Sequence, residues 1–184
     1  MNTLPKRKYS WHAVYLRYRT EKKVQEELNL KGVECYLPLK YTKRYWSDRI
    51  KIIGEPLFTS YIFVRISPLE YYDVLTVKGA LHYITFENKA VVISDDKIEL
   101  LKLFVEKVND NIQVSTERLA KGNIVKITKG PLKDHEGEVI EMRGKNYAIL
   151  RFNELGFHIQ VDLNLNEMEL VQKHNIAQIL QAEH

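Results

Sequence analysis

The chain of 184 residues is long enough for one or two domains, and its composition of 45% hydrophobic and 28% charged residues excludes a disordered or fibrous protein. No apolar run reaches the roughly 20 residues that a membrane-spanning helix needs, and residues 1–11 lack the apolar core of a signal peptide, so we expect no membrane association. The single cysteine, Cys35, cannot form an internal disulfide, which favours the cytoplasm.

Charge is unevenly distributed along the chain. Residues 1–51 contain 13 Lys and Arg against 5 Asp and Glu, whereas the remainder contains 15 against 19. A basic first third beside a mildly acidic remainder favours a surface that faces a polyanion. The alternative is that these charges only keep the chain soluble.

The first 108 residues alternate between strand and helix signals. Ser67 and Glu70 form a capping box with Pro68 between them, and Ser94 precedes two acidic residues, so each marks a helix start. Apolar periodicity and chain breakers predict, in order, a strand over 10–20, a helix over 21–32, a strand over 33–41, a bent arm over 42–52, a strand over 60–66, a helix over 68–78, a strand pair over 80–94 that turns at Glu87-Asn88, and a helix over 95–108. This order predicts a ferredoxin-like α/β sandwich within an α+β protein.

The stretch GEPLFTSYIFVR, residues 54–65, has two apolar faces. Because side chains two apart on a strand share a face, Tyr61 and Phe63 point one way while Ile62 and Val64 point the other. Helices on one side of such a sheet bury only one face. We therefore expect the face with Tyr61 and Phe63 to remain open.

The second part of the chain reads as all-β. Residues 108–120 lack periodicity and are interpreted as a linker. Five short β-like runs follow with turn residues between them, which predicts a small barrel with Gly137 at a tight corner. The tail, 173–184, has helical spacing but is too short to form a stable helix alone.

Two sets of motifs resemble the NusG family of transcription elongation factors. The spacing Gly-x-x-Val-x-Ile…Gly-Pro…Gly-x-Val in residues 121–142 is similar to the KOW motif, and Trp11–Arg19, GEPLFTSYIFVR and the Lys78-Gly79 turn resemble the NGN domain. The resemblance implies an NGN domain over 9–109, a linker over 110–118, an SH3-like β-barrel KOW domain over 119–172 and a tail over 173–184. The basic arm and the lack of long insertions favour a specialised, operon-targeted RfaH-like paralogue over a general housekeeping NusG.

The resemblance also implies a partner, RNA polymerase. In this family the NGN domain binds the clamp helices of the largest subunit through a hydrophobic patch and suppresses pausing or termination. The positions that match the patch are Tyr61, Phe63, Phe86 and Ile98. The alternative for all four is core packing, although clustered exposed aromatic residues usually mark interfaces.

A second set of residues points to nucleic acid. In the arm, Lys40, Lys43, Arg44 and Trp46 mix cations that neutralise phosphates with rings that stack on unpaired bases. Lys78 occupies a position where the family often has a basic residue facing nucleic acid. Non-template DNA and nascent RNA are the possible ligands, and the alternative is a solvated hairpin.

The KOW domain of the family contacts a small-subunit ribosomal protein or the Rho factor through the loop before its fourth strand. Leu155 and Phe157 occupy this loop, and barrel packing is the alternative role for both. The β-branched composition of the strands favours a permanent barrel over refolding into helices that would cover the NGN patch. We expect a monomer.

Two other classes of function were considered. An enzyme is disfavoured because the six histidines lack metal-ligand spacing and no nucleophile–base or paired-carboxylate motif is found, so neither a metal nor a cofactor is expected. A ribosome-associated RNA-binding protein with a KOW barrel would explain the basic charge and the KOW motif, but it leaves the aromatic segment 54–65 without a role.

Overall fold

The computed structural model describes residues 8–46, 48–108, 112–119, 121–130, 132–142, 144–163 and 168–172. The chain divides into two compact units, Met1–Val105 and Glu106–His184. The predictions made for residues 1–7 and for the tail 173–184 lie outside the described residues.

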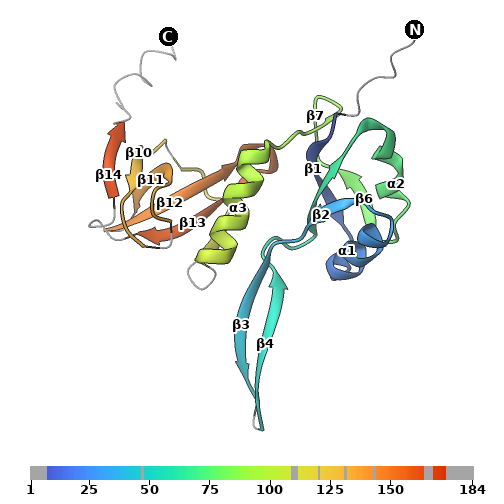
Figure 1. The fold of residues 1–184 in the computed structure, drawn as a ribbon, viewed down its shortest axis with the longest axis horizontal. Helices are drawn as coiled ribbons and strands as arrows, with labels where there is room; N and C mark the ends of the chain where they lie inside the picture. The colour runs from blue at the N-terminus through green and yellow to red at the C-terminus, as the bar shows by residue number, and fades with distance from the viewer. Residues whose placement is uncertain are drawn as a thin grey trace. The chain divides into compact units, whose positions relative to one another are not determined.

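The first unit is built on a four-stranded antiparallel sheet in the order β2-β5-β1-β6 (Figure 1). α1 connects β1 to β2 and α2 connects β5 to β6, as predicted, and the α+β class is confirmed. The strands are β1 (Ser10–Leu16), β2 (Glu34–Tyr36), β3 (Leu39–Tyr45), β4 (Ile50–Pro56), β5 (Tyr61–Ile66), β6 (Ala80–Tyr83), β7 (Thr85–Phe86) and β8 (Lys89–Ala90). The helices are α1 (Glu21–Leu30), the short 3₁₀ helix η1 (Pro68–Glu70), α2 (Tyr71–Leu75) and α3 (Asp95–Lys107).

One face of this sheet forms a core with α1 and α2. The even-numbered side chains of β5 point into it, as the alternation of the strand requires. The cluster includes Val14, Leu16, Val24, Leu28, Ile62, Val64, Ile66 and Val74, all 2% exposed or less. Each such side chain contributes about 1.5–3 kcal/mol by leaving water, so this face supplies much of the stability of the unit.

Most local signals form the structures they predict. Glu70 accepts hydrogen bonds from the backbone N and Oγ of Ser67, at 2.8 and 2.7 Å, which completes the capping box. Glu87 and Asn88 have positive φ values of 49° and 62° in the turn between β7 and β8. The second helix is shorter than predicted, because α2 ends at Leu75 and not near Lys78.

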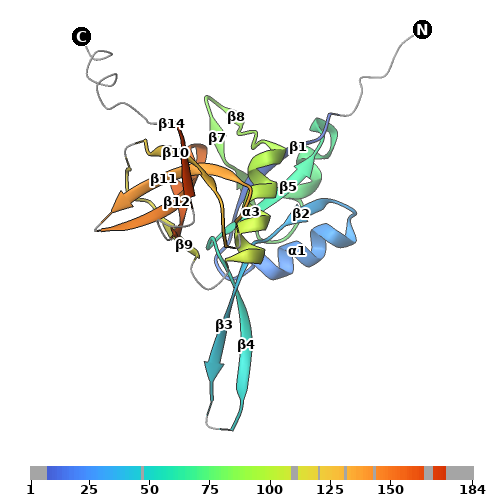
Figure 2. The same cartoon turned by 60° about the vertical axis from the view of Figure 1, so that its left-hand side comes forward.

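β3 and β4 form a separate two-stranded sheet that projects from the first unit as an arm (Figures 1 and 2). The predicted bend of the arm lies at Ser47-Asp48, and Ser47 is outside the described residues. Seven residue pairs, from Leu39↔Pro56 to Tyr45↔Ile50, define its register.

The second unit is a six-stranded sheet in the order β14-β10-β11-β12-β13-β9. All five predicted β-like runs form strands. In the described residues β14 and β9 are the two ends of this order and no pairing joins them, so a closed barrel is not confirmed. The elements are β9 (Ile112–Ser115), β10 (Asn123–Ile127), β11 (Glu136–Met142), β12 (Lys145–Phe152), the 3₁₀ helix η3 (Asn153–Leu155), β13 (Phe157–Leu163) and β14 (Met168–Gln172).

Part of the stretch interpreted as a linker is a strand. β9 pairs antiparallel with β13, with Val114 opposite Ile159 and Ile112 opposite Val161. Ile112 is buried, which gives this short segment an apolar anchor in the second unit. The lack of periodicity hid the strand because four residues are too few to show alternation.

The crowded glycine of the KOW-like motif is Gly122. A Cβ there would lie 2.2 Å from the carbonyl oxygen of Val139, whereas a Cβ on Gly137 would meet nothing within 4 Å. The expectation that a side chain at Gly137 would clash is therefore wrong. The close approach of backbone to backbone occurs where β10 begins.

We predict that Gly122→Ala destabilises the second unit by about 1–3 kcal/mol, the usual cost of overpacking. Gly137→Ala is the control and should be neutral or stabilising by up to about 1 kcal/mol, because alanine restricts the unfolded chain. Amide hydrogen exchange in β10 and β11 reports the stability of this unit. Equal effects of the two substitutions would contradict the assignment.

Candidate functional site

The second face of the first sheet carries aromatic and charged side chains. Trp11, Ala13 and Tyr15 on β1 lie opposite Arg65, Phe63 and Tyr61 on β5 in the antiparallel register, so the six side chains share this face. Tyr36 on β2 lies opposite Phe63 on its other side. This is the face that we expected to be open.

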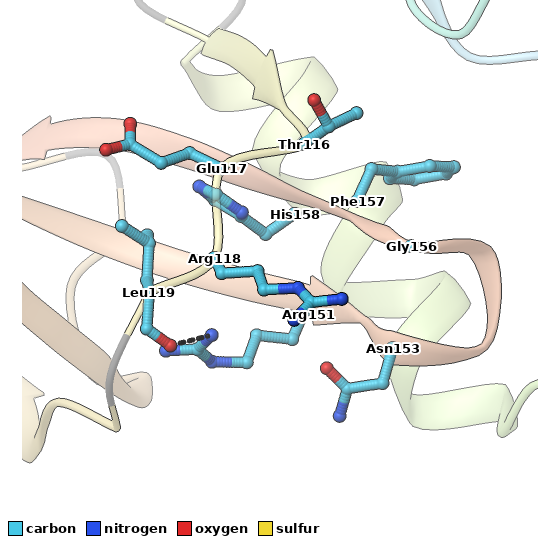
Figure 3. Close-up of a pocket in the computed structure, with 9 residues that line it drawn as sticks. All are labelled: Thr116, Glu117, Arg118, Leu119, Arg151, Asn153, Gly156, Phe157 and His158. Carbon is cyan, nitrogen blue, oxygen red and sulfur yellow. Dashed lines mark hydrogen bonds between the residues drawn. The ribbon is translucent and has the colours of Figure 1, made fainter.

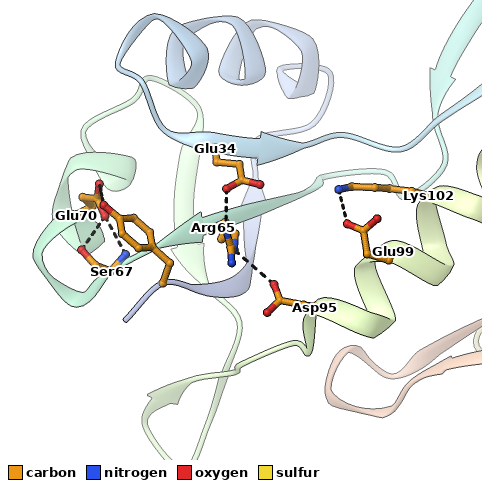
Figure 4. A network of polar contacts seen from close by, with 8 residues as sticks. Glu34, Arg65, Ser67, Glu70, Asp95, Glu99 and Lys102 are labelled. Carbon is orange, nitrogen blue, oxygen red and sulfur yellow. Dashed lines mark hydrogen bonds and ion pairs between the residues drawn. The ribbon is translucent and has the colours of Figure 1, made fainter. Parts of the chain in front are cut away.

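α3 covers one end of this second face (Figure 4). Asp95 Oδ1 lies 3.4 Å from Arg65 Nε, and Arg65 Nη1 lies 3.3 Å from Glu34 Oε2, so Arg65 joins the helix to the edge strand β2. Further along α3, on the same side of the helix as Asp95, Lys102 Nζ lies 5.5 Å from the ring centre of Trp11 and 5.8 Å from that of Tyr36. The prediction that helices cover only one face of the sheet is wrong.

The predicted polymerase-binding residues divide into two groups. Ile98 lies between Asp95 and Lys102 on the helix face that meets the sheet, and it is 0% exposed. Phe63 is also 0% exposed, with its ring 5.9 Å from that of Phe58. Tyr61 is half-buried, whereas Phe86 is 71% exposed beside the β7–β8 turn. Only Tyr61 and Phe86 therefore present side-chain surface.

An aromatic cluster surrounds Tyr61 at the other end of this face. The rings of Tyr15 and Tyr61 meet edge to face at 5.4 Å, and that of His82 lies 5.3 Å from Tyr15. Burial, and then the neighbouring Tyr15, raise the pKa of Tyr61, which keeps its hydroxyl protonated. Neither Tyr15 nor His82 was expected at this surface, although side chains two apart on a strand share a face, so Tyr15 lies on the same face as Ala13.

Lys78 lies exposed in the turn that precedes β6. The backbone N of Arg17 donates to the carbonyl of Gly79 at 2.8 Å, which brings the loop after β1 against this turn. The guanidinium of Arg19 lies 5.1 Å from the ring centre of Tyr18, and both side chains are exposed. The structure thus brings the turn that contains Lys78 against the loop that carries two more exposed cations, Arg17 and Arg19.

The arm carries the remaining predicted nucleic-acid residues. Lys43, Arg44 and Trp46 are exposed and Lys40 is half-buried. Arg44 Nη2 lies 2.9 Å from Glu55 Oε1 across the hairpin. An exposed pair of this kind contributes little stability, about 0–1 kcal/mol, so it orients Arg44 and does not hold the arm together.

The loop before β13 in the second unit borders a pocket of about 630 Å³ (Figure 3). Phe157 lines this pocket but is 9% exposed, and its ring lies 5.4 Å from that of Phe152. Leu155 is half-buried, and Gly156 follows it with a φ of +72°. The side chain of Phe157 packs within its own unit.

Arg151 connects two of the segments that line the pocket. It donates from Nε and Nη2 to Glu138 at 2.7 Å each, and from Nη1 to the carbonyl of Leu119 at 3.0 Å. The hydrogen bonds to Glu138 raise the pKa of Arg151, and the bond to Leu119 holds the segment after β9 against β12. Figure 3 shows Arg118 beside Arg151 among the residues that line the pocket.

The single thiol is unsuited to nucleophilic chemistry. Burial, and then the neighbouring Glu34, raise the pKa of Cys35 to about 11, so it stays protonated near neutral pH. Within the described ranges, no three His, Cys, Asp or Glu side chains are grouped so as to hold a metal ion. No helix of the described part is long and apolar enough to cross a membrane.

The fold defines a class of two-unit α+β proteins, in which a sandwich with an aromatic surface and a basic arm is followed by a β-sheet unit. Residues 9–102 match the sequence family described as "Transcription termination factor nusG". The chain belongs to the NusG family, which places it among transcription factors.

Of two solved structures that resemble this chain, one supports the fold. The structure described as "Domain interaction in Thermotoga maritima NusG" has a TM-score of 0.51 at 19% identity, covering 90% of this chain and 98% of that chain. The structure of the MjSpt4:Spt5 complex has a TM-score of 0.30 at 17% identity, covering 90% and 99%. At these identities the first comparison establishes fold alone, and the second superposes too poorly to carry an argument.

We predict that Phe63→Ala lowers the free energy of unfolding by about 3–5 kcal/mol, as expected for a buried aromatic side chain. Phe86→Ala is the matched control and should change it by less than about 0.5 kcal/mol, because its ring is exposed. Urea unfolding of the full chain measures both values. A small effect of Phe63→Ala would mean that the ring lies at the surface in solution.

Proposed function

We propose that this protein is a transcription elongation factor that binds RNA polymerase through its first unit and suppresses pausing or termination. The observation that carries the proposal is the family match over residues 9–102, which includes the whole aromatic face of the first sheet. The activity would take place in the cytoplasm, on a transcribing polymerase.

The partner surface we propose is the pair of clamp helices in the largest polymerase subunit. Tyr61 and Phe86 supply exposed aromatic surface, the residue type that dominates interface energetics. Phe63 and Ile98, the other two residues of the expected patch, lie beneath the surface and would support it. Tyr15 and His82 extend the same surface next to Tyr61.

Nucleic acid in the elongation complex is the second proposed ligand. Lys40, Lys43, Arg44 and Trp46 of the arm, together with Lys78, would contact non-template DNA or nascent RNA. The exposure of Lys43, Arg44, Trp46 and Lys78 supports this assignment. A reader of exposed strands would suit a specialised, operon-targeted paralogue, which is the form of the family that we propose here.

The second unit is proposed to act as the KOW module. It would form an SH3-like barrel and bind a small-subunit ribosomal protein or Rho through the loop with Leu155 and Phe157. Because Phe157 is nearly buried, the exposed edge of that loop and the pocket beside it would make the contact.

We predict that Tyr61→Ala combined with Phe86→Ala weakens binding to RNA polymerase elongation complexes at least tenfold, the loss expected when central aromatic contacts are removed. Tyr72→Ala is the control, because Tyr72 is an equally exposed aromatic residue on α2, which packs against the opposite face of the sheet. Binding is measured by fluorescence anisotropy of the labelled protein, and pausing by single-round transcription.

Unchanged polymerase binding by the double variant would refute the proposed docking surface. Salt-resistant association with ribosomal subunits in place of polymerase would instead favour the ribosome-associated RNA-binding protein. Circular dichroism of each variant confirms that the fold is retained.

A further inference from the structure

The arm is a β-ribbon with no third strand among the described residues. A two-stranded ribbon is at best marginally stable in water without something packed on its face. Five exposed apolar or aromatic side chains lie on this one, between 51% and 76% exposed: Tyr41, Tyr45, Trp46, Ile50 and Ile52. So much apolar surface on a projecting ribbon indicates a binding site.

The register sorts most of the arm into two chemically different faces. Lys43 lies opposite Ile52 and Tyr45 lies opposite Ile50, so these four side chains share a face with Tyr41. We call this set, Tyr41, Lys43, Tyr45, Ile50 and Ile52, the stacking strip. At about 3.4 Å per residue its two tyrosines are about 14 Å apart, with Lys43 midway between them.

The reverse side carries Lys40, Arg44 and Lys51, which we call the cationic face. Arg44 lies directly opposite Lys51 but also pairs with Glu55 on the same face, at 2.9 Å, so the repulsion between the two cations is only partly compensated. Over residues 39–56 the arm holds five Lys and Arg against two acidic residues. A polyanion would relieve this repulsion.

The ring of Tyr41 is supported on one side by the backbone of the neighbouring strand. It lies opposite Gly54 in the register, and a Cβ built on Gly54 would be 2.8 Å from Tyr41 Cε1. The ring therefore lies over the bare backbone of Gly54, which supports one side of it. The side chain is 51% exposed, so part of the ring surface can meet a flat ligand.

These features favour nucleic acid over protein as the occupant. The cores of protein interfaces are depleted in lysine, whereas Lys43 is at the centre of the strip. Aromatic rings alternating with cations are the arrangement that binds single strands, because every base offers a π-face and every nucleotide a phosphate.

The bases must be unpaired, because a duplex shows only base edges in its grooves and leaves no face to stack on. The strip also favours DNA over RNA. Ile50 and Ile52, the apolar part of the strip, offer no hydrogen-bonding side-chain group to the 2′-hydroxyls of an RNA strand, and burying a hydroxyl without a hydrogen bond is unfavourable.

We propose that the stacking strip binds single-stranded DNA, with bases stacked on Tyr41 and Tyr45 and a phosphate contacted by Lys43. The inference rests on the proposed function, in which the protein acts on a transcribing polymerase with an exposed DNA strand. It assigns the contact to the face with Tyr41 and Tyr45, while the cationic face adds attraction at longer range.

The test uses the full chain and a fluorescent oligothymidylate of about 15 nucleotides, the upper range for one single-strand-binding module. Tyr41→Leu combined with Tyr45→Leu keeps the apolar surface but removes the rings, and should weaken binding by about ten- to a hundredfold. Lys43→Gln should lower the salt dependence of binding, as the slope of log K against log salt, by about 0.7. Tyr72→Leu is the control and should leave binding unchanged.

Two comparisons decide the ligand class. A duplex of mixed sequence and an oligouridylate of the same length should both bind at least tenfold more weakly than the oligothymidylate. Equal or tighter binding of either one, or undiminished oligothymidylate binding by the double tyrosine variant, would overturn the inference.

Polymerase binding separates this inference from the proposed function. The double tyrosine variant should still bind core RNA polymerase without nucleic acid, because Tyr61 and Phe86 are intact. Loss of oligothymidylate binding with polymerase binding retained supports the inference. Oligothymidylate binding by a protein that never binds polymerase would refute the proposed function and leave the strip as a single-strand-binding site.

Discussion

The first unit depends on the crossing of α3 over the sheet face opposite α1 and α2. Three polar and aromatic contacts orient this helix: Asp95 with Arg65, and Lys102 over Trp11 and over Tyr36. Partly exposed pairs of this kind contribute little free energy, whereas the burial of Ile98 and Leu101 beneath the helix contributes about 1.5–3 kcal/mol for each side chain. The charged contacts therefore set the position, and apolar burial supplies the stability.

The packing on this face decides which aromatic side chains are available to a partner. Phe63 lies between Ala13 and Tyr36 in the register and is sealed, while Tyr61 lies one pair further along, beside Tyr15, and stays partly exposed. A single strand thus provides both a core residue and a surface residue on the same face. The proposed polymerase surface is narrower than the sequence indicated, and it is built from Tyr61, its ring neighbours and the β7–β8 turn.

The arm differs from the sheet, because most of its side chains are exposed and only its base, at Leu39, packs against the core. Its strands pair only with each other among the described residues, so its side chains are chosen for contact and not for packing. In the second unit, by contrast, a charged side chain connects two segments of the fold. Arg151 donates to Glu138 and to the carbonyl of Leu119 and ties a connecting segment to the sheet, so this cation has a structural role.

The sequence by itself determined the order of the three helices and of the sheet strands between them in the first unit, the α+β class, the capping box at Ser67, the turn at Glu87-Asn88 and the five later strands of the second unit. These features depend on residues close together in the chain, whose backbone preferences and periodicity are visible locally. Only the tertiary structure decided that α3 covers the second face, that Phe63 and Ile98 are buried, that β9 joins β13, and that Gly122 and not Gly137 is crowded. Each of these outcomes depends on which distant segment packs against a residue, and a local pattern of apolar side chains is the same whether a helix, a partner or water lies above it.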